Sequence, residues 1–321
     1  MLRIVLLVAW LPAIALALAL CLWGLVEQKS ELVASLVQML PFLSPEILAE
    51  PRAYRVEIWT LCYSYFLSTE LTFSMVLILL VGPNLISQDL RYNALPLYFS
   101  RPLRRIDYFL GKLGVIAAFL AMVIIVPSMT AYVLGLLFSL DITIVRDTFG
   151  LLLASIAYGL VIALSAGLLI LALSSLSRNS RYIALFWLAI WFISSGVAVT
   201  LESVNQEQSQ RQAWQSAHQR PGMKFDAANF SQAELEAAKT NWRPLVSYTG
   251  NLSRVGQHML GTDACWEKLG QLQPPNQRSQ FLLAVMGPQY PWYWSAAVLA
   301  ALFGLSACIL KFAIKSLDRL K

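Results

Sequence analysis

The sequence predicts an all-α integral membrane protein with about six transmembrane helices, cytosolic N- and C-termini and a small extracytoplasmic module between spans five and six. Of its 321 residues, 58% are hydrophobic and 13% are charged, and the mean hydropathy is +0.61. A soluble domain of this length could not bury so much apolar surface. The net charge of +6 does not indicate nucleic-acid binding, because Lys and Arg fall between apolar runs.

Six apolar segments are long enough to cross a bilayer. A helix rises about 1.5 Å per residue, so about 20 residues span a hydrocarbon core of about 30 Å. The segments of this length are residues 4–26, 60–86, 109–138, 149–173, 182–201 and 292–310. The first continues into Glu27 without a small-residue cleavage site, which favours an uncleaved span over a signal peptide. A shorter run, 32–48, contains two prolines and is expected on the outer surface.

Positive charges give the predicted orientation, because cytosolic loops carry an excess of Lys and Arg. With both termini inside, twelve such residues fall on the inner side and four in the short outer loops. The inner residues are Arg3, Arg91, Arg101, Arg104, Arg105, Lys112, Arg178, Arg181, Lys311, Lys315, Arg319 and Lys321; the outer ones are Lys29, Arg52, Arg55 and Arg146. Aromatic residues at the outer ends would be interfacial anchors or packing residues, namely Trp23, Trp59, Tyr290, Trp292 and Trp294.

The expected domains follow from these spans. Residues 1–201 form the membrane domain, 202–289 the extracytoplasmic module, and 290–321 the sixth span with a basic cytosolic tail. The module is long enough to fold. Ser231 and Glu234 form a capping-box pattern that predicts a helix toward Lys239. Later apolar residues indicate a small core or a cap over the membrane mouth, with substrate binding as the alternative.

Cysteine and histidine spacing gives no pattern for a metal site or a nucleophile. The four cysteines lack CxxC spacing, and His218 and His258 lack partners, so both are expected to be surface or packing residues. Cys62 and Cys265 fall on the predicted outer side, where an oxidising compartment would permit a disulfide. We therefore expect no catalytic residue, metal or cofactor on this chain.

The turn after the second span, residues 87–112, carries the most informative pattern. Four apolar residues recur there at helical spacing on one face: Leu90, Ala94, Leu97 and Tyr98. They predict a short amphipathic helix on the cytosolic surface, bent at Pro96 or ending near Asn93. Pro102 suits a first helical position, so a new helix is expected to continue as the third span. By itself this pattern fits equally a basic loop whose arginines contact lipid phosphate.

The same turn resembles that of the permease subunits of type-2 ATP-binding-cassette (ABC) exporters. The resemblance rests on an acidic residue, Arg, a small polar turn and an apolar patch, followed by Leu-Tyr-Phe-Ser-Arg-Pro-Leu-Arg-Arg and Gly-Lys before a span. In that family the turn is the coupling element that docks on a separate ATPase. The matching positions are Asp89, Arg91, Ser100, Arg101, Pro102, Leu103 and Arg105. Six spans with both ends inside also fit the family.

The resemblance implies an exporter whose ATPase is a separate protein. The phosphate-binding pattern GxxxxGK[ST] does not occur, since the one Gly-Lys pair, Gly111-Lys112, is followed by Leu113. We therefore expect no enzyme activity on this chain. The expected partners are a cytosolic ABC ATPase that binds ATP and Mg²⁺, and a second permease subunit, identical or homologous, in a bacterial cytoplasmic (inner) membrane. The resemblance names no substrate, because the long outer loop is not a general family feature.

Glu70 is an intramembrane polar candidate within the second span, in the sequence Ser68-Thr-Glu-Leu-Thr72. A charged side chain there is costly, so Glu70 should face the bundle interior, water or a partner. Alternatively, it lies near the outer interface and stays hydrated. Glu70 supports a rival function, an ion-coupled transporter. A second rival is a membrane-anchored sensor or assembly protein whose outer module binds a ligand.

Overall fold

The computed structural model describes residues 2–28, 45–94, 98, 105–139, 141, 143–219, 235–287 and 289–318, and every regular element within them is helical. In these ranges six helices are long and apolar enough to cross a membrane: Leu2–Glu27, Pro51–Arg91, Ile106–Phe138, Thr143–Leu176, Ser180–Ser209 and Trp292–Phe312. Each contains one predicted span. The prediction of an all-α, multi-pass membrane protein is therefore confirmed. Of the run 32–48, only the last residues are described, in the short helix α4 (Pro45–Ala49).

The chain divides into two compact units. The first comprises Met1–Ile190 with Leu299–Lys321, and the second is Trp191–Val298. The second unit is wider at both ends than the module expected at 202–289, because it begins within the fifth span and ends within the sixth. Two serines within the apolar span explain the earlier start, since the Ser194 hydroxyl accepts the Tyr248 N–H and the Ser195 hydroxyl bonds that of Ser247.

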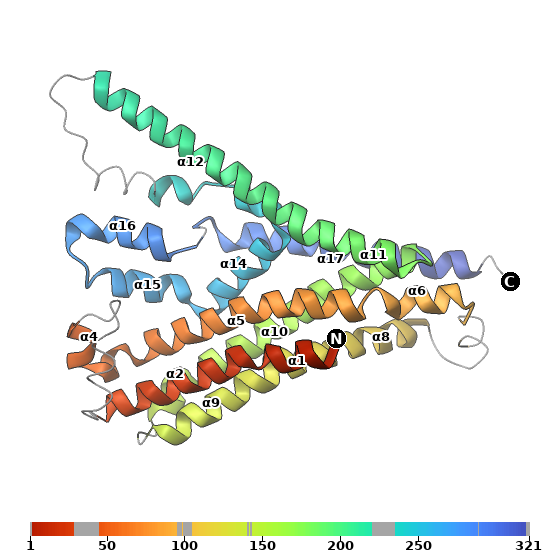
Figure 1. Ribbon diagram of the computed structural model, residues 1–321, viewed down its shortest axis with the longest axis horizontal. Coiled ribbons are helices and arrows are strands. Elements are labelled where there is room, and N and C mark those ends of the chain that lie inside the picture. Colours follow the sequence, from red (N-terminus) through yellow and green to blue (C-terminus); the bar gives the residue numbers. More distant parts are fainter. Residues whose placement is uncertain are drawn as a thin grey trace. The chain divides into compact units, whose positions relative to one another are not determined.

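Long helices of the first four spans, with the start of the fifth, build most of the first unit (Figure 1). In chain order its main elements are α1 (Leu2–Ala9), α2 (Leu11–Glu27), the 3₁₀ turn η1 (Pro51–Tyr54), α5 (Arg55–Val81), α6 (Asn84–Arg91), α8 (Arg105–Leu120), the π-helical turn η2 (Ala121–Ile125), α9 (Val126–Phe138), α10 (Thr143–Leu176) and α11 (Ser180–Leu188). Helix α2 lies along α9, while α10 contacts α5, α6 and α8. The fourth span is therefore central to this unit.

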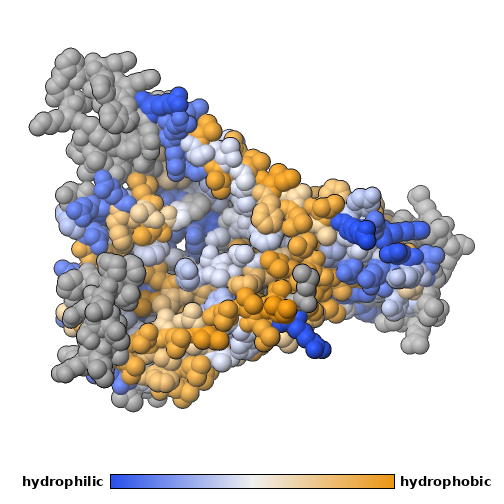
Figure 2. Space-filling view, in the orientation of Figure 1, coloured by the Kyte–Doolittle hydropathy of each residue, from blue (hydrophilic) through white to orange (hydrophobic). Residues whose placement is uncertain are grey.

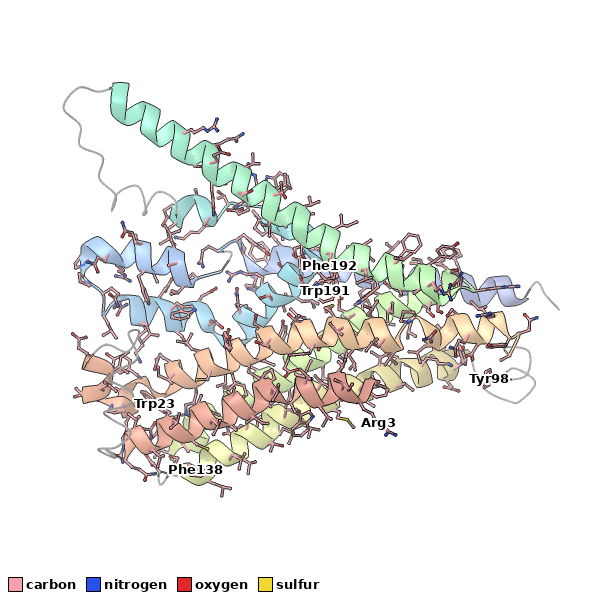
Figure 3. The ribbon with its side chains drawn as sticks, in the orientation of Figure 1. Arg3, Trp23, Tyr98, Phe138, Trp191 and Phe192 are labelled. Atoms are coloured by element: carbon pink, nitrogen blue, oxygen red, sulfur yellow. The ribbon has the colours of Figure 1, made fainter. Side chains whose placement is uncertain are left out.

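Small residues allow the helices of the first unit to approach closely. A Cβ atom at Gly135 would lie 2.8 Å from the Trp59 ring, and one at Gly24 would lie 3.0 Å from the Phe138 carbonyl oxygen. Trp23 and Phe138 lie at the same end of the α2–α9 pair (Figure 3). Trp23 and Trp59 are buried, so these two predicted outer aromatics are packing residues rather than exposed anchors. Close packing of this kind is what holds helices together in a lipid environment.

Apolar side chains cover the outward face of α2 and α9 (Figure 2). On α2, Leu11, Ile14, Leu18 and Leu22 are all more than 45% exposed, at intervals of three or four residues. Such a stripe would be costly in water but suits contact with lipid tails.

Proline explains the π-helical turn in the third span. Pro127 follows η2 directly, and its ring cannot accommodate a regular preceding helical turn. Near this distortion, the Tyr63 hydroxyl donates to the Ser128 carbonyl at 3.0 Å, and the hydroxyls of Ser128 and Ser155 lie 2.9 Å apart. Hydroxyl groups of α5, α9 and α10 thus bond across the helices near this distortion.

One end of the first unit is joined by a buried arginine. The Arg55 side chain is 3% exposed and binds both carboxylate oxygens of Glu27, at 2.6 to 3.1 Å. It also lies 3.2 Å from Asp141 and 3.6 Å from Asp147. We call these four residues the Arg55 network. It connects the end of α2, the start of α5 and the start of α10, which the alternating direction of the spans brings together.

The second unit contains α12 (Ser194–Gln219), the 3₁₀ turn η4 (Arg243–Val246), α14 (Tyr248–Leu260), α15 (Thr262–Gly270), α16 (Pro275–Val285) and the start of α17 (Trp292–Asp318). Arg254 lies at its centre, with Nη1 2.8 Å from an Asp263 oxygen and Nε donating to the Tyr290 carbonyl at 2.9 Å. His258 stacks on Trp292, with ring centres 4.3 Å apart. This agrees with the expected packing role of His258.

Several sequence predictions fall on residues of which little or nothing is described. Ser231 and Glu234 of the capping box lie outside the described ranges, which resume with helical residues 235–238. His218 is helical, but its side chain is not described. No disulfide joins Cys62 and Cys265 in this structure.

Candidate functional site

The candidate site begins where the second span breaks into α6. Helix α5 ends at Val81, Gly82 and Pro83 form a turn, and α6 starts at Asn84. Pro83 has no N–H group, which interrupts the helical hydrogen bonds there, but Gly82 and Pro83 keep helical φ and ψ angles and α6 continues the second span. On α6, Ile86 and Ser87 are buried whereas Gln88 and Arg91 are exposed. This helix differs from the predicted one, because of the four expected apolar residues α6 contains only Leu90, which is half-buried, and its buried face is made by Ile86 and Ser87.

Ser174 of α10 fixes this break in position. Its buried hydroxyl oxygen accepts the backbone N–H groups of Ile86 and Ser87, both at 3.1 Å, and donates to the Pro83 carbonyl at 3.1 Å. These N–H groups lie in the first turn of α6, where helices lack internal acceptors. A side chain from the fourth span thus caps the short helix after the second.

Asp89 connects α6 to the third span. Its carboxylate lies 2.7 Å from Lys112 Nζ and accepts the Tyr108 hydroxyl at 2.5 Å. Lys112 Nζ also lies 5.4 Å from the centre of the Tyr108 ring. The Asp89 and Lys112 side chains are 15% and 22% exposed, so water reaches the pair only in part. The helix is therefore held on two sides, by α10 and by α8.

The end of α6 agrees with the sequence prediction. The helix stops at Arg91, and Asn93 has a φ of 50°, a left-handed conformation that asparagine tolerates better than most residues. The Ala94 N–H then donates to the Asp89 carbonyl at 2.9 Å and closes the helix end. Arg91 is exposed, and its guanidinium lies 5.8 Å from the Tyr92 ring centre. The prediction that the helix ends near Asn93 is confirmed.

The other residues of the proposed coupling turn are described only in part. Ser100, Arg101, Pro102 and Leu103 lie outside the described residues, and Arg105 begins α8 without a described side chain. Of the predicted apolar face, Leu97 also lies outside. Tyr98 (labelled in Figure 3) is described, and its ring centre lies 5.7 Å from that of Tyr108. The structure thus brings together Asp89, Lys112, Tyr108 and Tyr98.

Glu70 lies apart from this cluster, near the middle of the second span. Its side chain is fully buried, and neither carboxylate oxygen has a hydrogen-bond partner within the described part of the chain. Ser74 donates to the backbone carbonyl of Glu70 at 2.7 Å and leaves the carboxyl unpaired. Of the two alternatives for Glu70, the structure favours the bundle interior over the hydrated outer interface.

Sequence reasoning missed the residues that hold α6 in place. Ser174 and Tyr108 carry no charge pattern or motif, and Lys112 drew attention only as one of the inner positive charges and as part of a Gly-Lys pair. A weak signal existed for Ser174, which lies in a Ser-Ser pair at the end of an otherwise apolar span. Polar residues there often bond to backbone groups of a neighbouring helix.

No family model, curated protein or solved structure matches this chain. Among the described residues, no group of three or more His, Cys, Asp or Glu side chains could hold a metal ion. The functional argument therefore rests on the geometry of α6 and on Glu70.

Proposed function

We propose that this chain is the membrane-spanning permease subunit of an ABC-type exporter, which moves an unidentified substrate with ATP hydrolysed by a separate cytosolic ATPase. One observation carries the proposal, namely the position of α6. This short amphipathic helix follows the second span directly and is bonded to the third span through Asp89 and Lys112 and to the fourth through Ser174.

A helix attached in this way can transmit force to several spans. Packed helices move as rigid bodies rather than deform continuously, so a push on α6 would reach α5, α8 and α10 together. Exposed Arg91 and Gln88 leave a polar face for a protein partner, whereas buried Ile86 and Ser87 hold the other face to the bundle. A loop that only contacted lipid phosphate would not need these buried backbone bonds.

The rest of the proposal follows from that assignment. The chain has cytosolic termini and an extracytoplasmic module, and it lies in a bacterial cytoplasmic membrane beside a second permease subunit, identical or homologous. ATP and Mg²⁺ bind the partner ATPase, and no residue of this chain is catalytic. Ser100, Arg101, Pro102, Leu103 and Arg105 extend the docking surface beyond α6.

Co-purification with an ATPase tests the proposal. The chain is expressed with the ABC ATPase encoded by a neighbouring reading frame, and complex formation and ATP hydrolysis are measured. Arg91→Glu, and the double change Arg101→Glu with Arg105→Glu, should release the ATPase or uncouple hydrolysis from transport. Arg146→Glu is the matched control, because this exposed arginine lies in the first turns of α10, at the end of the unit opposite α6. Absence of a nucleotide-binding subunit from the unaltered complex would contradict the proposal.

Glu70 supports a second candidate, an ion-coupled transporter. Burying an ionised carboxylate without a partner is costly, and such residues mark proton or ion pathways in membrane proteins. The test is Glu70→Gln, which keeps the shape and removes the titratable group. Loss of pH-dependent substrate uptake into vesicles, with no ATP requirement, would favour this candidate. Unchanged transport would remove it.

A further inference from the structure

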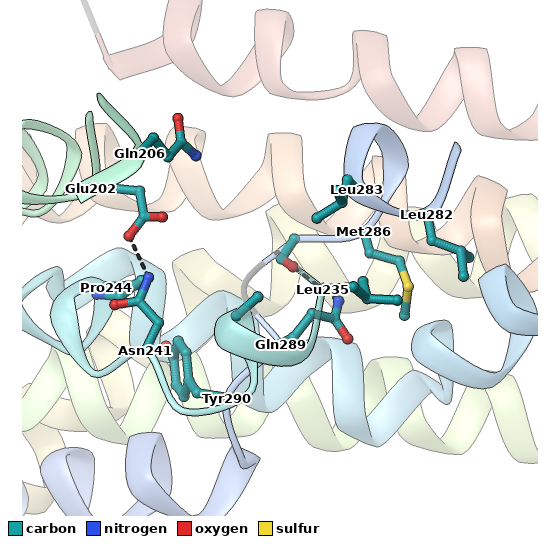
Figure 4. A pocket seen from close by; sticks show the side chains of 12 residues that line it. Glu202, Gln206, Leu235, Asn241, Pro244, Leu282, Leu283, Met286, Gln289 and Tyr290 are labelled. Atoms are coloured by element: carbon teal, nitrogen blue, oxygen red, sulfur yellow. Dashed lines mark hydrogen bonds between the residues drawn. The ribbon is translucent and has the colours of Figure 1, made fainter. Parts of the chain in front are cut away.

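A pocket within the second unit combines one carboxylate, several amides and an apolar wall (Figure 4). It encloses about 240 Å³. Glu202 and Gln206 line it from α12, and Asn241 and Gln289 from the segments before η4 and α17. Pockets that mix apolar surface with a few convergent polar groups are typical of small-molecule sites.

Glu202 is the only charged residue among those that line this pocket. Asn241 Nδ2 donates to Glu202 Oε2 at 2.5 Å. The Asn241 side-chain oxygen in turn accepts the Arg243 backbone N–H at 3.2 Å, which fixes the amide with its NH₂ group toward Glu202. Arg243 Nη1 also donates to this oxygen at 3.4 Å, so the nearest described guanidinium is bound to Asn241, and within the described part of the chain Glu202 itself forms no ion pair.

The opposite side of the pocket is apolar. Leu283 and Met286 line it, together with Leu282 and Leu235 (Figure 4). Buried Tyr290 closes one side, and its hydroxyl accepts a hydrogen bond from Ser295 at 3.1 Å. The thioether of Met286 is flexible and polarisable, which suits an aliphatic or aromatic ligand group.

We propose that this pocket binds an organic monocation, an ammonium group that carries one apolar substituent. The ammonium N–H groups would donate to the free Glu202 oxygen and to the side-chain carbonyl of Gln206, which lies on the same side of the pocket, and the substituent would lie against Leu283 and Met286 (Figure 4). A carboxylate ligand would be repelled by Glu202. A neutral ligand would displace water from the Glu202 carboxylate and supply no positive charge in its place. The pocket would bind such a cation whether or not the chain exports a substrate.

Methyl NMR of the full chain in lipid nanodiscs tests this site directly. The eight methionines are labelled with ¹³C at the methyl group, and the Met286 signal is assigned with Met286→Leu. The probe is 2-phenylethylammonium, and the matched probes are 3-phenylpropanoate and 2-phenylethanol. The ammonium should shift the Met286 signal in a saturable way, and the other two should not. No shift with the ammonium, or equal shifts with all three probes, would overturn the proposal.

Two variants make the test specific. Glu202→Gln should weaken binding of 2-phenylethylammonium about tenfold or more, because it removes a charge-assisted hydrogen bond. The control is Glu207→Gln on the same helix, an exposed residue paired with Arg211 that should leave affinity unchanged. Ala238→Phe, at another residue that lines the pocket, should block binding by filling it. Unchanged affinity in Glu202→Gln, with the other methionine signals in place, would contradict the assignment.

Discussion

The two ends of the first unit hold their charges in different ways. At one end, Arg55 is 3% exposed and meets three carboxylates from α2 and α10. At the other, Asp89 meets one lysine, and both side chains are partly exposed. The Arg55–Glu27 pair is nearly fully buried, and loss of either partner would leave a buried charge uncompensated. The Asp89–Lys112 pair is partly exposed, and Asp89 keeps the hydrogen bond from Tyr108 when the lysine is lost. We therefore expect the Arg55 end to resist disruption more strongly than the α6 end.

Removal of Arg55 should have the largest effect on stability. Arg55→Met leaves Glu27, Asp141 and Asp147 together without a cation, and should destabilise the folded chain by about 3–5 kcal/mol. Thermal unfolding in detergent would measure the loss. Arg52→Met is the control, since Arg52 is exposed on the adjoining 3₁₀ turn. Equal stability of the two variants would mean that the Arg55 network does not hold this end together.

Removal of the Ser174 hydroxyl should have the next largest effect. Ser174→Ala removes only the hydroxyl and leaves the N–H groups of Ile86 and Ser87 without their side-chain acceptor, which should cost about 1–3 kcal/mol. Hydrogen exchange should rise at α6 and not at the Arg55 end. Ser175→Ala is the matched control, because the Ser175 hydroxyl donates to the Ala172 carbonyl of its own helix.

Breakage of the Asp89–Lys112 pair should change coupling more than stability. Asp89→Asn is expected to cost about 1 kcal/mol, because Lys112 is partly exposed and the asparagine oxygen can still accept the Tyr108 hydroxyl. ATP-driven transport should nevertheless fall, if α6 transmits the movement of the ATPase. The exchange of charges in Asp89→Lys with Lys112→Asp should restore it in part. Asp107→Asn, an exposed acid on α8, should leave transport unchanged.

The smallest effect concerns acid stability at the Arg55 end. Hydrogen bonds from Thr143, together with Arg55, lower the pKa of Asp141 from 3.8 to about 2. A lowered pKa contributes stability that is present above the usual value and lost as pH falls through the native one. The free energy of unfolding should therefore fall as the pH is lowered from about 4 to about 2. This part of the pH dependence should be absent in Asp141→Asn. In Arg55→Met it should shrink but persist, because Thr143 is the larger cause.

The sequence predicted the membrane spans better than the contacts that join them. Apolar length located all six spans, and the proline positions indicated that the amphipathic helix would end near Asn93. Arg55, by contrast, was only a positive charge on the outer side, and Ser174 carried no expectation. Composition reports how much of a segment suits lipid, but it does not show which side chain of another helix lies opposite.

The sequence by itself therefore determined the number of spans and their all-helical nature. Local periodicity and chain length are sufficient for these features, because each helix must satisfy its own backbone bonds within the bilayer. The tertiary structure decided the rest. Ser174 reaches Ile86 across 88 residues of chain, and Glu202 meets Asn241 across 39. Such pairs arise only when helices pack, since hydroxyl, amide and carboxylate groups choose partners by distance in space rather than by spacing along the chain.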